Sequence, residues 1–132
     1  MREVTEALAA RLAAGRMDED AFARMATNLE RQSVALAQDD QAAYSALDAE
    51  FHTLICDHCG NRPLQEVLRS IRDKIWPLKV PLGPLLPQLY QDHRALLEAL
   101  RAEQPEQAEA IVRKHMQAIM EAIGQTMKEA PC

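Results

Sequence analysis

Apolar side chains recur every three or four residues along most of the chain, and this spacing constrains the fold more than any other feature. Between positions 63 and 75, for example, Leu64, Leu68, Ile71 and Ile75 would all lie on one face of an α-helix. Six segments share this spacing and predict six helices, with limits near 2–14, 18–38, 39–60, 63–75, 85–102 and 105–128. The stretch WPLKVPLGPLLP, between the fourth and fifth segments, carries four prolines and predicts a kink or loop.

Each predicted helix has one apolar face, so the helices must pack against one another. The chain has only 4 glycines and is rich in Ala and Leu, which favours helix over strand. Its 132 residues, 48% of them hydrophobic and 27% charged, are typical of one globular domain. We therefore expect a single all-α domain over residues 1–132, folded as an antiparallel bundle of about six helices.

Charge and composition argue against several classes of partner. The net charge is −5 and aromatic residues make up 4%, whereas direct nucleic-acid binding needs a basic patch or aromatic platforms for the bases. No apolar run approaches the roughly 20 residues of a membrane span, and Glu3 and Glu6 near the N-terminus do not fit a signal peptide. Three cysteines, an odd number, suit a reducing compartment. These features predict a cytoplasmic protein without membrane contact.

Three histidines and one aspartate fall on or beside the apolar faces. His93 and His115 lie at the centres of the fifth and sixth apolar faces, while Asp48 and His52, four residues apart, lie together at the edge of the third. A buried polar group without a partner costs about 1–3 kcal/mol. One inward histidine is easily satisfied by a neighbour, but four inward groups on three helices predict a shared metal ion in the core of the bundle.

Three imidazoles and a carboxylate suit Zn²⁺ or Ni²⁺, with Mn²⁺ or Fe²⁺ as alternatives, because this donor set does not choose among them. A structural zinc site is usually closed and rich in sulfur. The predicted set resembles an open site instead, with room for water or a carboxylate.

The neighbouring CDHC sequence, Cys56 to Cys59, is a less credible metal site. It lacks the second pair of cysteines that a zinc knuckle requires, and it lies at a helix end just before Gly60 and Asn61. We expect two half-buried cysteines and a solvated His58 there.

Several segments together resemble the FCD domain, the C-terminal effector domain of the FadR branch of GntR-type bacterial transcription regulators. The similar segments are REVTEALAARLAA, DDQAAYSALDAEFHTLI, GNRPLQEVLRSI and DHRALLEALRAEQPEQAEAIVRKHM, which cover nearly the whole chain. Each segment is weak evidence alone, whereas the combination is specific.

The resemblance implies an all-α bundle that forms a homodimer and holds a divalent metal ion through the same Asp48, His52, His93 and His115. It also implies a small carboxylate effector bound beside the metal. Candidate effector contacts are Arg2 by its position and Asn61 by its match to the family's GN. Arg72 and Lys79 are candidates by spacing only, because they flank the apolar face of the fourth helix.

Two features depart from the family. Gln104 and Pro105 replace the usual Asp before the last helix, which changes a helix cap and not the site. No winged helix-turn-helix precedes the domain in this sequence, so DNA would be contacted only through a segment absent from it. The expected function is effector sensing and dimerisation, not catalysis; a small metal-dependent enzyme and a metal-free dimerisation module are the alternatives.

Overall fold

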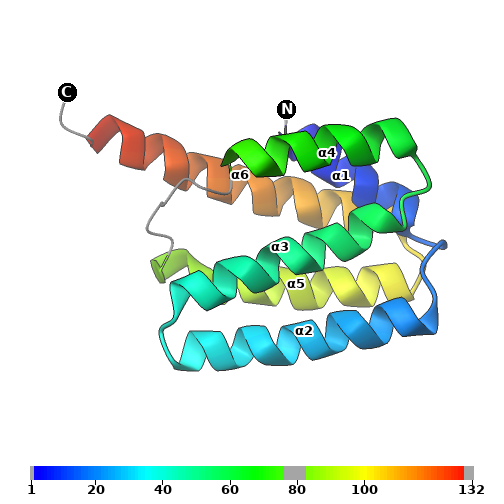
Figure 1. Ribbon diagram of the computed structural model, residues 1–132, viewed down its shortest axis with the longest axis horizontal. Helices are drawn as coiled ribbons and strands as arrows, with labels where there is room; N and C mark the ends of the chain where they lie inside the picture. Colours follow the sequence, from blue (N-terminus) through cyan, green and yellow to red (C-terminus); the bar gives the residue numbers. More distant parts are fainter. Residues whose placement is uncertain (1, 76–82, 130–132) are drawn as a thin grey trace.

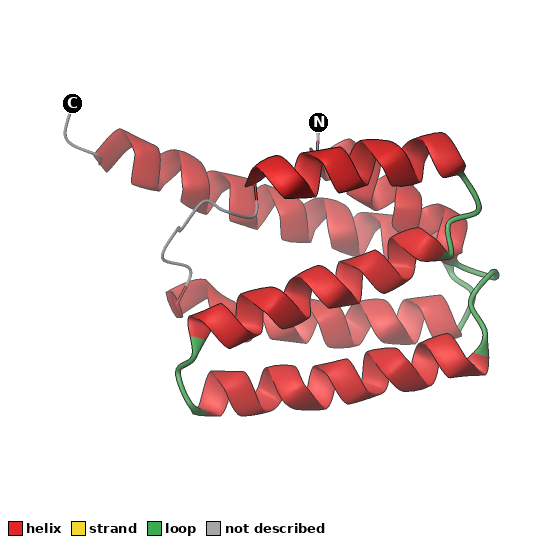
Figure 2. Ribbon diagram, viewed as in Figure 1, coloured by secondary structure: helices red, strands yellow, loops and turns green. Residues whose placement is uncertain are grey.

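The computed structural model describes residues 2–75 and 83–129, with side chains at 3–71 and 83–124. This part of the chain is helical and contains no strand (Figures 1 and 2). The helices are α1 (Arg2–Ala13), α2 (Glu19–Ala37), α3 (Gln41–Asp57), α4 (Arg62–Ile75), the short 3-10 helix η1 (Gly83–Leu85), α5 (Leu86–Arg101) and α6 (Pro105–Glu129). The predicted all-α antiparallel bundle is thus confirmed. None of the described helices is long and apolar enough to cross a membrane.

Five helices form a closed ring around the main core. Following the contacts, α3 packs on α2, α2 on α5, α5 on α6, α6 on α1, and α1 returns to α3. The helix α4 lies outside this ring against α1 and α3, as Figure 1 shows. The interior of the ring is therefore reached by side chains from five different helices.

Short polar residues fix where several helices begin. The carboxylate of Asp18 accepts a hydrogen bond from the Ala21 amide at 2.8 Å and caps α2. Asp40 caps α3 in the same way, through the Ala43 amide at 3.0 Å. Gly15, with φ +89°, follows α1 and makes the left-handed turn that ends it.

The buried face of α2 is only partly the one that the sequence predicts. Helical spacing puts Phe22, Met25, Leu29, Ser33 and Leu36 on one inward face, but Ser33 is exposed, whereas Asn28 and Gln32 are buried. The inward positions begin at Ala21 and Phe22 and continue through these two amides, because α2 contacts both α3 and α5 and so buries a broader face.

The helix α1 also turns differently from expectation. Helical spacing puts Val4, Leu8 and Leu12 on one face and predicts that this face is buried, but Val4 and Leu8 are 54% and 39% exposed. The buried residues of α1 are instead mainly alanines: Ala7, Ala10 and Ala13 in the main core, and Ala9 in a second apolar cluster beneath α4. Since α1 packs against α6 and α3 within the ring and against α4 outside it, its small side chains permit the close approach of all three helices. Helical spacing also puts Val67 beside the apolar face of α4 and predicts that it is buried, but it is 44% exposed.

Candidate metal centre

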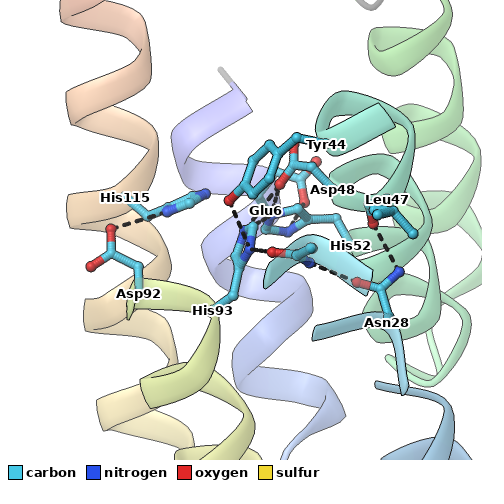
Figure 3. Close-up of polar contacts among 10 residues, drawn as sticks. Glu6, Asn28, Tyr44, Leu47, Asp48, His52, Asp92, His93 and His115 are labelled. Atoms are coloured by element: carbon cyan, nitrogen blue, oxygen red, sulfur yellow. Dashed lines mark hydrogen bonds and ion pairs between the residues drawn. The ribbon is translucent and has the colours of Figure 1, made fainter. Parts of the chain in front are cut away.

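One polar cluster occupies the interior of the ring. It consists of Asp48, His52, His93 and His115, hereafter the Asp/His cluster. The side chains come from α3, α5 and α6, and all four are buried (Figure 3). One potential ligand atom from each lies within 4.8 Å of the others. The structure therefore brings together the four residues that the sequence analysis selected, and this cluster can hold a metal ion.

Three ligand atoms form a tight triangle. The Oδ1 of Asp48 lies 3.0 Å from Nε2 of His93 and 3.2 Å from Nε2 of His52, and these two nitrogens are 3.3 Å apart. Ligands about 2.0–2.2 Å from one ion in octahedral or tetrahedral geometry lie about 2.8–3.6 Å from each other. The triangle thus has the dimensions of part of a metal coordination sphere.

Two buried atoms in the cluster make no hydrogen bond to any described residue: Oδ1 of Asp48 and Nε2 of His115. The short contacts of the Asp48 oxygen with two imidazoles lack the direction of a hydrogen bond. Each unsatisfied buried group costs about 1–3 kcal/mol. A divalent cation would satisfy both atoms, so the residues present fit a metal ion.

A polar partner faces the outer nitrogen of each histidine. Nδ1 of His93 lies 2.7 Å from Oε1 of Gln32, and Nδ1 of His115 lies 3.1 Å from Oδ2 of Asp92. Nδ1 of His52 is 3.9 Å from the buried carboxylate of Glu6, an ion-pair separation. Such partners orient imidazoles and leave Nε2 facing the ion in metal sites.

Burial and charge favour the protonation states that bind metal. Burial on its own would raise the pKa of Asp48, but the charge of His52 and polar contacts with His52 and His93 hold that pKa well below its ordinary value. Burial lowers the pKa of both His93 and His115. Near neutral pH the cluster therefore offers an ionised Asp48 carboxylate and neutral imidazoles at His93 and His115, which are the forms that coordinate a cation.

Of the four predicted effector contacts, only Asn61 has a described side chain, and it does not lie in the Asp/His cluster. Asn61 is exposed, and its side chain caps α4 by accepting a hydrogen bond from the Leu64 amide at 3.0 Å. The side chains of Arg2 and Arg72 and the whole of Lys79 lie outside the described residues. Their roles stay predictions.

The CDHC segment has a structural role, as expected, but it is more buried than predicted: both cysteines, expected to be half-buried, are buried, and His58, expected to be solvated, is partly buried. Cys56 and Cys59 are buried in the second apolar cluster, beneath Leu64 and Leu68 of α4. His58 is partly buried, and its Nδ1 lies 2.7 Å from the Leu54 carbonyl oxygen. These side chains stabilise the end of α3 and its contact with α4.

Sequence reasoning missed the partners that surround the cluster. Asn28 and Gln32 are four residues apart and flank Leu29, so their spacing could have placed both on the inner face of α2. Glu6 is a buried acid among the alanines of α1. Its burial can be predicted only once those alanines are known to face inward. Asp92 gave no signal, because it lies at the partly exposed edge of α5.

The fold and the cluster define a class of protein: an all-helical domain whose core can hold a metal ion through imidazole and carboxylate groups. Within this class the chain belongs to the FCD domain family, whose model matches residues 1–118. The family resemblance seen in the sequence motifs is thereby confirmed. Comparison with curated proteins finds no match.

Solved structures with a similar fold include E. coli McbR/YncC, with a TM-score of 0.83 and 20% identity over 95% of this chain and 65% of that one. Streptococcus agalactiae GntR is also similar, with a TM-score of 0.80 and 21% identity over 92% of this chain and 55% of that one. At these identities the likeness shows the fold alone. The chain spans just under two-thirds of the first protein and just over half of the second.

Proposed function

We propose that this chain is the ligand-sensing and dimerising domain of a GntR/FadR-type bacterial transcription regulator. In this role the Asp/His cluster binds a divalent metal ion, and the ion binds a small carboxylate effector. The observation that carries the proposal is the convergence of three imidazoles and one carboxylate inside an FCD domain, with two of their atoms otherwise unsatisfied.

The donor set explains why a carboxylate is the proposed effector. Three neutral imidazoles and one carboxylate offset only one of the two positive charges of a divalent ion. A bound ion therefore supplies a positive centre that attracts a second anion, and ions of this kind accept more than four ligands. Zn²⁺ and Ni²⁺ match the nitrogen-rich set best, and Mn²⁺ and Fe²⁺ are compatible with it.

Regulation requires that the ligand bind one arrangement of the protein more tightly than another. The cluster joins α3, α5 and α6, so ligation would change how firmly these helices are held together. In the proposed regulator this change alters the geometry of a homodimer, and DNA is contacted through a winged helix-turn-helix domain outside this sequence. The net charge of −5 is consistent with a domain that does not itself contact DNA.

The metal part of the proposal is tested by elemental analysis and native mass spectrometry of untagged protein purified from cells. We expect about one divalent ion per chain, because all four donors converge on a single site. The variant His93→Gln should lose the ion, whereas His58→Gln should retain it, since His58 lies outside the cluster. Wild-type protein that carries no ion and gains no thermal stability from added Zn²⁺ or Ni²⁺ would contradict the proposal.

The effector part is tested with metal-loaded protein and a panel of small dicarboxylates, sugar acids and hydroxy acids. A true effector at 100 times its Kd should stabilise the fold by about 2.7 kcal/mol. The same compound should have no effect on protein stripped of metal with a chelator. Equal stabilisation of metal-free and metal-loaded protein would show that the carboxylate binds elsewhere.

A further inference from the structure

The helix α2 contributes no member of the Asp/His cluster, yet it places two buried amides beside it. Gln32 is 0% and Asn28 is 3% exposed. Oε1 of Gln32 lies 2.7 Å from Nδ1 of His93, and Nε2 of Gln32 donates a hydrogen bond to Oδ1 of Asn28 at 2.6 Å. Nδ2 of Asn28 in turn donates to the Leu47 carbonyl oxygen at 3.0 Å. Figure 3 shows this row of contacts from His93 on α5, through α2, to Leu47 on α3.

The Leu47 carbonyl gives the row a fixed direction. A carbonyl oxygen only accepts hydrogen bonds, so Asn28 must face it with its NH₂ group. The oxygen of Asn28 is then directed at Gln32, which must present its own NH₂ group there and its oxygen to His93. Rotating either side-chain amide by 180° would place two acceptors or two donors against each other in a buried space.

The direction of the row determines which nitrogen of His93 carries the proton. Because Gln32 offers an oxygen, Nδ1 of His93 must be protonated and must donate. In the neutral imidazole this leaves Nε2 with a free lone pair, and Nε2 is the atom 3.0 Å from Asp48 and 3.3 Å from His52. Leu47 directly precedes Asp48 in α3. The same helical turn therefore supplies the carboxylate of the cluster and the carbonyl oxygen that, through the two amides, orients His93.

We propose that Asn28 and Gln32 are positioning residues that lock His93 in the tautomer and ring orientation required for metal binding. The inference rests on the proposed metal function but makes a separate prediction about metal-free protein. The hydroxyl of Tyr44 also lies near Nδ1 of His93, but at 3.4 Å, and is the weaker of the two contacts. Gln32 is therefore the principal acceptor and Asn28 acts on His93 only through it.

The first test is imidazole ¹⁵N NMR of the chelator-treated wild-type chain, assigned with His93→Gln. Neutral His93 should be protonated at Nδ1. A His93 ring protonated mainly at Nε2, or a mixture of the two tautomers, would overturn the inference. This measurement needs no substitution of Gln32 or Asn28, so it remains decisive even if a variant of either residue fails to fold.

The second test compares Zn²⁺ affinity, measured by competition with a chromophoric chelator, in Gln32→Met, Asn28→Leu and the control Gln65→Met. Gln65 donates to the Cys56 carbonyl outside the cluster, so its replacement removes a comparable amide contact. Loss of an outer partner weakens metal binding about 10–100-fold, and Gln32→Met should fall in this range. Asn28→Leu should weaken binding by a smaller factor and give mixed His93 tautomers, while Gln65→Met should match wild type.

The outcomes separate this inference from the function on which it rests. Wild-type affinity in both Gln32→Met and Asn28→Leu would overturn the positioning role and leave the metal site intact. A wild-type chain that binds no Zn²⁺ would overturn the metal function and the positioning role together, whatever the tautomer of His93. An equal loss in Gln65→Met would show a general effect of lost amide contacts and would also overturn the positioning role.

Discussion

Replacing His115 by leucine should stabilise the metal-free protein and remove most of the stabilisation that metal provides. His115 is 2% exposed, and its Nε2 makes no hydrogen bond within the described residues. Leucine has a similar size and no polar atom, so it fits the same apolar face of α6. The sign of its effect on stability therefore depends on whether an ion occupies the cluster.

The magnitude follows from the contacts of the imidazole. Removing an unsatisfied buried nitrogen relieves about 1–3 kcal/mol, while losing the hydrogen bond from Nδ1 to Asp92 costs about 1 kcal/mol, since Asp92 is 20% exposed and can bind water instead. Metal-free His115→Leu should thus be about 0–2 kcal/mol more stable than wild type. With Zn²⁺ at 100 times the wild-type Kd, wild type gains about 2.7 kcal/mol, and a variant with 100-fold weaker affinity gains about 0.4 kcal/mol.

Urea unfolding in chelator and in a buffered concentration of free Zn²⁺ measures both quantities. The variant His58→Leu is the matched control, because it removes an imidazole outside the cluster and should retain the full gain from Zn²⁺. The reasoning is refuted if Zn²⁺ stabilises His115→Leu as much as wild type. It is also refuted if wild type gains nothing, which would favour a bundle whose histidines only fill the core.

Two further predictions concern pH and a helix cap. The folded state lowers the pKa of His93 and His115, so the unfolded chain binds more protons. Metal-free protein should therefore keep its full stability above the ordinary histidine pKa of about 6.5 and lose stability as pH falls below it. Unfolding curves that coincide at about pH 7.5 and 5.5 would contradict this direction of pH dependence. Asp18→Ala should lower the free energy of unfolding by about 1 kcal/mol because it removes the cap of α2, whereas Asp20→Ala removes the same charge from an exposed position and should cost much less. Equal losses in thermal unfolding of the two variants would show that charge, and not the hydrogen bond, stabilises this helix end.

The Asp/His cluster was predictable from sequence because helical periodicity alone places its members. His93 and His115 occupy the centres of strongly apolar faces, and any bundle that buries those faces must bury the imidazoles. Asp48 and His52 share one side of α3 through their four-residue spacing. Their convergence required only that the three faces meet in one core.

The orientation of α1 and α2 was harder to predict, because each helix contacts more than one neighbour. Val4 and Leu8 are larger than the alanines of α1, so hydrophobicity favoured the wrong face, and the close packing of α4 against α1 decided the outcome. Gln32 is completely buried because it has a specific partner in His93. Such a position depends on a residue of another helix, 61 positions away, and no local pattern reports it.

The contact between α1 and α6 closes the helical ring and determines how late in its synthesis the domain can finish folding. Arg11 pairs with Glu109, and Gln117 donates to Glu3, so the contacts that seal the ring join residues 98 and 114 positions apart. A nascent chain on the ribosome can form α1 early, but this helix has no neighbour on its α6 side until nearly the whole sequence has been synthesised. His115 arrives with α6, so the proposed metal site would be complete only after translation of the domain is almost finished.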